Sequence, residues 1–147
     1  MRVLAIASAG GHWVQLLRLL PAFEENEIVF VSTHKSFSQT VKNCPFYVIP
    51  DANRWNKLKL LKVCFCVLGL LYIIKPDVII TTGAAPGLMA VIAGRLLGAK
   101  TIWIDSIANV EKLSLSGRIA LLFANRTYTQ WPDLATSKIK YKGSVIG

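Results

Sequence analysis

The 147-residue sequence predicts an α/β fold built on a mostly parallel sheet. Short apolar runs rich in β-branched residues alternate with longer helical runs along the chain. Small residues follow two of the expected strands, and Pro21, Pro76 and Gly98 mark helix ends. Hydrophobic residues make up 53% of the chain and charged residues 17%, which excludes an intrinsically disordered protein.

Ten elements are expected, each placed by its own apolar pattern. The short β-rich runs predict six strands, over Arg2–Ala7, Ile28–Ser32, Phe46–Ile49, Asp77–Thr81, Lys100–Ile104 and Thr127–Trp131. The longer runs between them predict four helices, over His12–Leu20, Trp55–Ile74, Pro86–Leu97 and Ser116–Ala124. No linker, repeat or low-complexity stretch interrupts the series, so we expect residues 1–147 to form a single domain.

Charge is unevenly distributed along the chain. The formal net charge is +9, and residues 54–75 carry five basic residues with no acidic one. Such a patch suits phosphates, whether of a nucleotide-linked substrate, a lipid headgroup or a nucleic acid. Three cysteines (Cys44, Cys64 and Cys66) and two histidines lack zinc-site spacing, and no metal site or cofactor is expected. We interpret the cysteines as reduced, mostly buried thiols of an intracellular protein.

Two loops rich in small residues are expected at the carboxyl edge of the sheet. They are Ser8–His12, after the first strand, and Thr82–Gly87, after the Asp77–Thr81 strand. Open α/β sheets bind ligands at this edge, where helix N-termini offer free N–H groups to an anion. Neither loop has GxGxxG or Walker spacing, so a generic dinucleotide or P-loop site is poorly supported. Simple tight turns are the alternative.

His12 falls in the first turn of the first expected helix, at this ligand edge. A neutral imidazole there suits a general base, and a charged one suits a phosphate. The alternative is a packing or capping histidine. His34, in a polar loop after the second strand, is a weaker candidate.

The segment from Arg54 to Lys75 combines basic residues with an apolar run. Residues 63–74 are apolar apart from Gly69, and twelve residues are too few for a helix to span a bilayer, which takes about 20. Four basic residues crowd the helix N-terminus against its dipole: Arg54, Lys57, Lys59 and Lys62. Anionic headgroups would offset that repulsion while Trp55, Leu58, Leu61 and Phe65 enter the interface. The alternative is a helix packed on the sheet with a solvated basic end.

Three segments together resemble a known family. They are Ala7–His12 with the helix through Leu20, Pro76–Pro86, and Ile102–Lys112 continuing through Ser114, Ser116 and Gly117 to Gln130-Trp131. This combination, over about residues 3–145, resembles the acceptor-side subunit of two-subunit glycosyltransferases that act on lipid-linked sugars. Its eukaryotic member serves the enzyme that adds the second N-acetylglucosamine to dolichol diphosphate, and bacterial members occur in capsule and exopolysaccharide synthesis.

The resemblance implies a Rossmann-like parallel sheet forming a single lobe, similar to the N-terminal half of MurG-type GT-B enzymes. A partner chain then supplies the lobe that binds the UDP-sugar, and the acceptor is a sugar on a polyprenyl diphosphate. The loops are implied to face the acceptor diphosphate, through Gly10, Gly11, Thr82, Gly83 and Ala84. His12 is the expected base, with Asp105 and Glu111 in reserve, although Glu111 is equally well an ordinary solvated acid.

This chain departs from the family pattern in three ways. It lacks the transmembrane anchor of the eukaryotic subunit, so we expect a bacterial, peripheral protein on the cytoplasmic face of the membrane. Ser8 replaces the first glycine of the usual loop, and Asp105 stands where relatives more often carry glutamate.

There are two alternative functions. One is a non-catalytic anchor that activates a partner glycosyltransferase. The other is a nucleic-acid-binding module, which we do not expect because the basic patch coincides with an apolar helix rather than a recognised motif.

Overall fold

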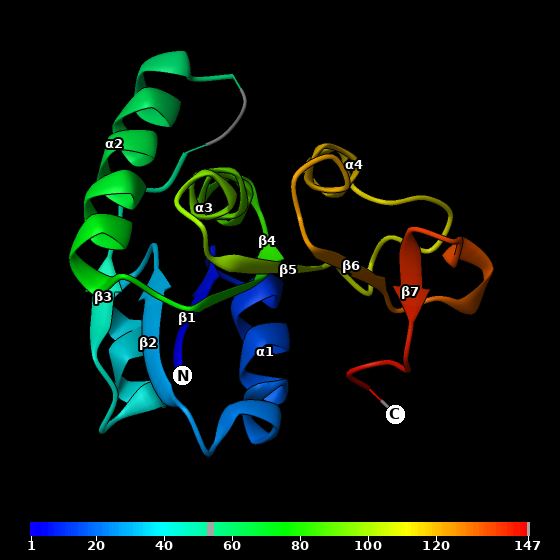
Figure 1. Ribbon diagram of the computed structural model, residues 1–147, viewed down its shortest axis with the longest axis horizontal. Helices are drawn as coiled ribbons and strands as arrows, with labels where there is room; N and C mark the ends of the chain where they lie inside the picture. Colours follow the sequence, from blue (N-terminus) through cyan, green and yellow to red (C-terminus); the bar gives the residue numbers. More distant parts are fainter. Residues whose placement is uncertain (53–54, 147) are drawn as a thin grey trace.

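The computed structural model describes residues 1–52 and 55–146. Seven parallel strands form one sheet in the order β3-β2-β1-β4-β5-β6-β7 (Figure 1). The strands are β1 (Arg2–Ala7), β2 (Glu27–Ser32), β3 (Phe46–Val48), β4 (Val78–Gly83), β5 (Lys100–Ile104), β6 (Arg126–Thr129) and β7 (Ile139–Tyr141). The predicted α/β fold with a parallel sheet is therefore confirmed.

Helices cover both faces of the sheet. One face carries three α-helices side by side, α2 (Lys57–Ile74), α3 (Ala85–Leu96) and α4 (Leu115–Ala120), and α1 (Gly11–Arg18) lies on the other (Figure 1). Three 3-10 segments complete the chain: η1 (Leu20–Phe23), η2 (Lys35–Val41) and η3 (Pro132–Leu134). Within the described residues, no helix is both long and apolar enough to cross a bilayer.

The core follows the two-residue period of the strands. On β1, Leu4 and Ile6 face α2 and α3, where they meet Val63 and Val67. The intervening residues of β1 face α1 and pack in the cluster that contains Trp13. Because β1 is central and buried on both faces, the loop that follows it has a rigid base.

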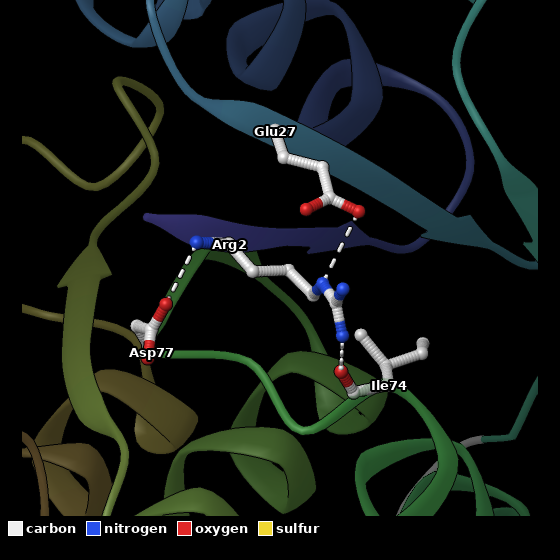
Figure 2. Close-up of polar contacts among 4 residues, drawn as sticks. All are labelled: Arg2, Glu27, Ile74 and Asp77. Carbon is white, nitrogen blue, oxygen red and sulfur yellow. Dashed lines mark hydrogen bonds and ion pairs between the residues drawn. The ribbon is translucent and has the colours of Figure 1, made fainter.

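Arg2 links several elements at the amino edge of the sheet (Figure 2). Its guanidinium donates to the carbonyl oxygen of Ile74 at the end of α2 (2.6 Å) and pairs with Glu27 on β2 (3.2 Å). The Arg2 backbone N–H donates to the Asp77 carboxylate before β4 (2.8 Å). The ion pair is half exposed and worth at most about 1 kcal/mol, so the contact with Ile74 matters more, because it satisfies a carbonyl at a helix end.

The observed elements differ from the expected ones mainly at their ends. The helix expected over His12–Leu20 stops at Arg18, and Pro21 lies inside η1 rather than just beyond the helix. The helix expected over Ser116–Ala124 is only Leu115–Ala120. The helix expected from Trp55 begins at Lys57, because the Asn56 side chain caps it by accepting from the Lys59 N–H (3.1 Å).

Strand β7 and segment η2 were not expected. β7 has three residues in a polar, lysine-rich stretch, so it lacks the apolar run that marks a strand.

Candidate active site

The loops after β1 and β4 lie side by side at the carboxyl edge of the sheet. The Ser8 N–H donates to the Gly83 carbonyl oxygen (3.0 Å), and the Ala84 N–H donates to the Ser8 hydroxyl (3.3 Å). Serine at this position therefore joins the two loops. The strand order brings them together because β1 and β4 are direct neighbours.

His12 is held against the β4 loop by two hydrogen bonds. Its Nδ1 lies 2.8 Å from the Thr82 carbonyl oxygen, and the Thr82 hydroxyl donates to the His12 carbonyl oxygen (2.5 Å). A carbonyl oxygen only accepts hydrogen bonds, so Nδ1 must carry the proton. In the neutral ring the free lone pair is therefore on Nε2.

Glycine at position 83 makes room for the imidazole. A Cβ atom on Gly83 would lie 2.9 Å from both Cε1 and Nδ1 of His12, and the backbone φ there is +115°. Gly10 precedes α1 and has a φ of +81°. A Cβ atom added at Gly10 or at Gly11 would meet no other atom within 4 Å. The N-terminus of α1 is thus unobstructed by side chains beside the histidine.

A pocket of about 270 Å³ lies at these loops. Its lining comes from α1, the end of β4 with the loop that follows it, β5 with the segment that follows it, and α4. The lining residues are His12, Thr82, Gly83, Ala84, Trp103, Asp105, Ser106, Ala108, Asn109, Ser114 and Ser116. The structure therefore brings together His12, Asp105 and the three expected residues of the β4 loop.

Asp105 is buried and accepts four hydrogen bonds. Its Oδ1 accepts from Trp103 Nε1 (3.0 Å) and the Ser114 hydroxyl (2.7 Å), and its Oδ2 from Asn109 Nδ2 (3.0 Å) and the Ser114 N–H (3.0 Å). None of these partners is His12, whose Nδ1 faces Thr82. The carboxylate instead folds the segment between β5 and α4 around itself, which the spacing of Asp105 and Ser114 in the sequence does not reveal.

Asp105→Ala is expected to lower the free energy of unfolding by about 2–4 kcal/mol, because it leaves one buried donor and three partly buried donors without an acceptor. Urea unfolding of the chain measures this. Glu111→Ala is the matched control, since Glu111 lies on the same segment but is exposed, and its change should stay within about 0.5 kcal/mol. Equal effects of the two substitutions would contradict the role given to Asp105.

The other expected site residues lie apart from the pocket. Gly10, Gly11 and Glu111 are exposed and are not among the lining residues. His34 is exposed and caps η2 by accepting from the Ser36 N–H (3.2 Å). The three cysteines are free but only half-buried, so the expectation that they are mostly buried is wrong. Among the described residues, no group of three or more His, Cys, Asp or Glu side chains is arranged to hold a metal ion.

Helix α2 presents an apolar stripe beside its basic residues. Lys57, Lys59 and Lys62 are exposed, and Trp55 just before the helix is 80% exposed. The stripe repeats every three to four residues and is at least one-third exposed throughout, over Leu58, Leu61, Phe65, Leu68 and Tyr72. The opposite side of α2 packs on the sheet through Val63, Val67 and Leu71. Arg54, also expected in this surface, lies outside the described residues.

Two buried glutamines near the pocket have no role that the sequence predicts. Gln15 on α1 and Gln130 after β6 are 7% and 4% exposed, and they bond to each other and to the segment after β5. For Gln15, the sequence offers one signal of burial: it is an uncharged polar residue inside the apolar run around Trp13 and Leu16.

Comparison with known proteins identifies relatives by sequence. Residues 55–145 match the family described as "Oligosaccharide biosynthesis protein Alg14 like". The UDP-N-acetylglucosamine transferase subunit alg14 of Schizosaccharomyces pombe is 30% identical over 95% of this chain and 79% of the relative. The human subunit of the same name is 25% identical over 99% of this chain and 81% of its own length. These relatives are eukaryotic, and they give no support to the expectation of a bacterial protein.

Solved structures show the same fold. MurG of Acinetobacter baumannii superposes with a TM-score of 0.77 at 18% identity, over 96% of this chain and 45% of MurG. The UDP-N-acetylglucosamine 2-epimerase of Rickettsia bellii gives a TM-score of 0.74 at 13% identity, over 99% of this chain and 45% of the epimerase. The chain thus spans about half the length of these two proteins, and the likeness confirms the Rossmann-like architecture.

Proposed function

Because the chain belongs to the Alg14-like family of oligosaccharide biosynthesis proteins, we propose that it is the acceptor-side subunit of a UDP-N-acetylglucosamine transferase. A partner chain binds the nucleotide sugar, and the sugar passes to a saccharide carried on a polyprenyl diphosphate. The observation that carries this proposal is the pocket at the carboxyl ends of β1, β4 and β5, with His12 in its wall.

His12 acts as the general base. Its Nδ1–H is engaged by the Thr82 carbonyl, so Nε2 is the nitrogen that accepts a proton. The acceptor hydroxyl oxygen attacks the anomeric carbon of the donor, the bond from that carbon to the diphosphate breaks, and the hydroxyl proton moves to Nε2. The held ring contributes by fixing the base before the substrate arrives.

The acceptor diphosphate binds at the N-terminus of α1. The first N–H groups of a helix have no partner inside the helix, and the positive end of the helix dipole favours an anion there. Gly10 and Gly11 leave that end open to close approach. The Thr82 hydroxyl and the Ala84 N–H are already bonded within the protein, so the β4 loop serves mainly to shape the site.

Asp105 serves as a positioning residue rather than a base, since four donors occupy its carboxylate. It fixes the segment after β5, which forms part of the pocket wall. Glu111 is a solvated surface acid in this proposal.

Helix α2 brings the site to the lipid carrier. Its three exposed lysines attract anionic headgroups, and the stripe from Leu58 to Tyr72 enters the interface. The helix therefore lies on the membrane rather than across it, and the buried Val63 and Val67 keep it attached to the sheet.

The purified chain alone is expected to show no transfer, because in this proposal the partner chain binds the nucleotide sugar. The assay combines the chain with UDP-N-acetylglucosamine and a polyprenyl-diphosphate-linked saccharide, with and without the donor-binding partner. Turnover by the chain alone would contradict the two-subunit proposal. Full turnover by the partner alone on vesicles would instead support the non-catalytic anchor.

A further inference from the structure

Two buried glutamines join the helix that carries His12 to the opposite wall of the pocket. We propose that Gln15, with Gln130, is a positioning residue that sets the spacing between His12 and the segment Ser106–Asn109. This proposal rests on the proposed function for its activity test, but its structural part can be tested without any transfer reaction.

Gln15 lies one helical turn beyond His12 on α1 and contacts the opposite wall directly. Its Nε2 donates to the Ser106 hydroxyl (3.2 Å), and its Oε1 accepts from the Ile107 N–H (3.2 Å). Because a backbone N–H only donates, the contact with Ile107 fixes the orientation of the amide. Ser106, Ala108 and Asn109 line the same pocket as His12, so these bonds span from one wall to the other.

Gln130 closes the bridge from the side of β6. Its Nε2 donates both to Gln15 Oε1 and to the Asp105 carbonyl oxygen (3.0 Å for the latter), and its Oε1 accepts from the Val145 N–H (3.0 Å). Trp131 adds a bond from Nε1 to the Ile107 carbonyl oxygen (2.7 Å). Both glutamine oxygens and both Nε2 groups are therefore engaged within the protein, which suits positioning rather than contact with a ligand.

The bridge is distinct from the hydrogen bonds of the Asp105 carboxylate. That carboxylate folds the segment after β5 onto itself through Trp103, Asn109 and Ser114, and none of these residues lies on α1. Gln15 supplies the side-chain bonds from α1 to this segment. Without these hydrogen bonds, the distance between His12 and the segment Ser106–Asn109 is no longer fixed, even if both remain folded.

Amide hydrogen exchange by NMR on the chain alone tests the bridge. Gln15→Leu is expected to speed exchange of the Ile107 N–H about tenfold, because that donor loses its acceptor. Gln15→Glu should restore most of the protection, since a carboxylate accepts from Ile107 and Gln130 and the Ser106 hydroxyl can donate to it. Gln39→Leu, at an exposed glutamine on η2, is the matched control and should change nothing. Unchanged protection of Ile107 in a folded Gln15→Leu chain would overturn the proposal.

Steady-state kinetics of the transferase reconstituted with its partner test the role. Gln15→Leu should lower kcat about tenfold or more with little change in the KM for UDP-N-acetylglucosamine. In a His12→Ala background the same substitution should cost almost nothing further, because its effect passes through His12. An equal loss in both backgrounds would overturn the positioning role. If His12→Ala alone leaves turnover unchanged, the assignment of His12 as the base fails, and the exchange result still decides the bridge.

Discussion

His12→Ala is expected to lower turnover of the reconstituted transferase by about 10²–10⁴-fold, the range usual for loss of a general base. The structure supports this size of effect because the Thr82 carbonyl fixes the ring and leaves the Nε2 lone pair for the substrate. Initial rates with saturating donor and acceptor measure it. Binding to the partner and to vesicles should be unchanged.

Two further substitutions make this result specific. His12→Gln should remain near the alanine level, because an amide does not accept a proton at neutral pH. His34→Ala should keep at least about half of the activity, since His34 is exposed and caps η2. Recovery of most activity by His12→Gln would assign His12 to binding the diphosphate instead, with the loss appearing mainly as weaker acceptor binding.

Replacing Lys57, Lys59 and Lys62 together by glutamate is expected to weaken partition onto anionic vesicles at least about 100-fold. Each basic residue near such a surface contributes roughly 1 kcal/mol, and reversal adds repulsion to the lost attraction. Co-sedimentation with phosphatidylserine-containing vesicles measures the change. The exposed apolar stripe should retain weak, salt-resistant binding, unlike binding to a nucleic acid, which falls steeply with salt.

The matched control changes the same number of charges elsewhere. Lys112, Lys138 and Lys142 are also exposed and lie outside α2, so their replacement by glutamate should cost much less. If both triple variants lose the same affinity, net charge rather than α2 directs the protein to the membrane. If neither loses any, α2 is simply a core-packing helix with a solvated basic end.

The sequence predicted the sheet because its strands are locally distinctive. Residues 2–7 and 78–81 are apolar runs followed by small residues, and parallel pairing then places their loops at one edge. The same logic places His12 and Thr82 at one edge, but it does not predict that β1 and β4 pair directly, which is what sets the two residues side by side. Strand β7 could not be predicted, because its three residues gain their conformation from pairing with β6 rather than from their own pattern.

The hydrogen bonds of the site could not be predicted in the same way. Asp105 and Ser114 are separated by nine positions, and Gln15 and Gln130 by 115. Such pairs depend on how loops close and on which buried polar groups need partners. A single sequence gives residue types without those partners, which is why Asp105 was expected as a reserve base and no role was expected for either glutamine.

The place of β1 inside the sheet also affects how the chain folds while it is being synthesised. β1 pairs on one side with β2, but its other partner is β4, so that Val3 lies beside Val78. A chain that leaves the ribosome amino terminus first can assemble β3, β2 and β1 while β4 is still untranslated. During that interval Leu4 and Ile6 lie on an open apolar strand edge, the kind that favours aggregation. The open edge of β1 is therefore covered only once β4 has emerged.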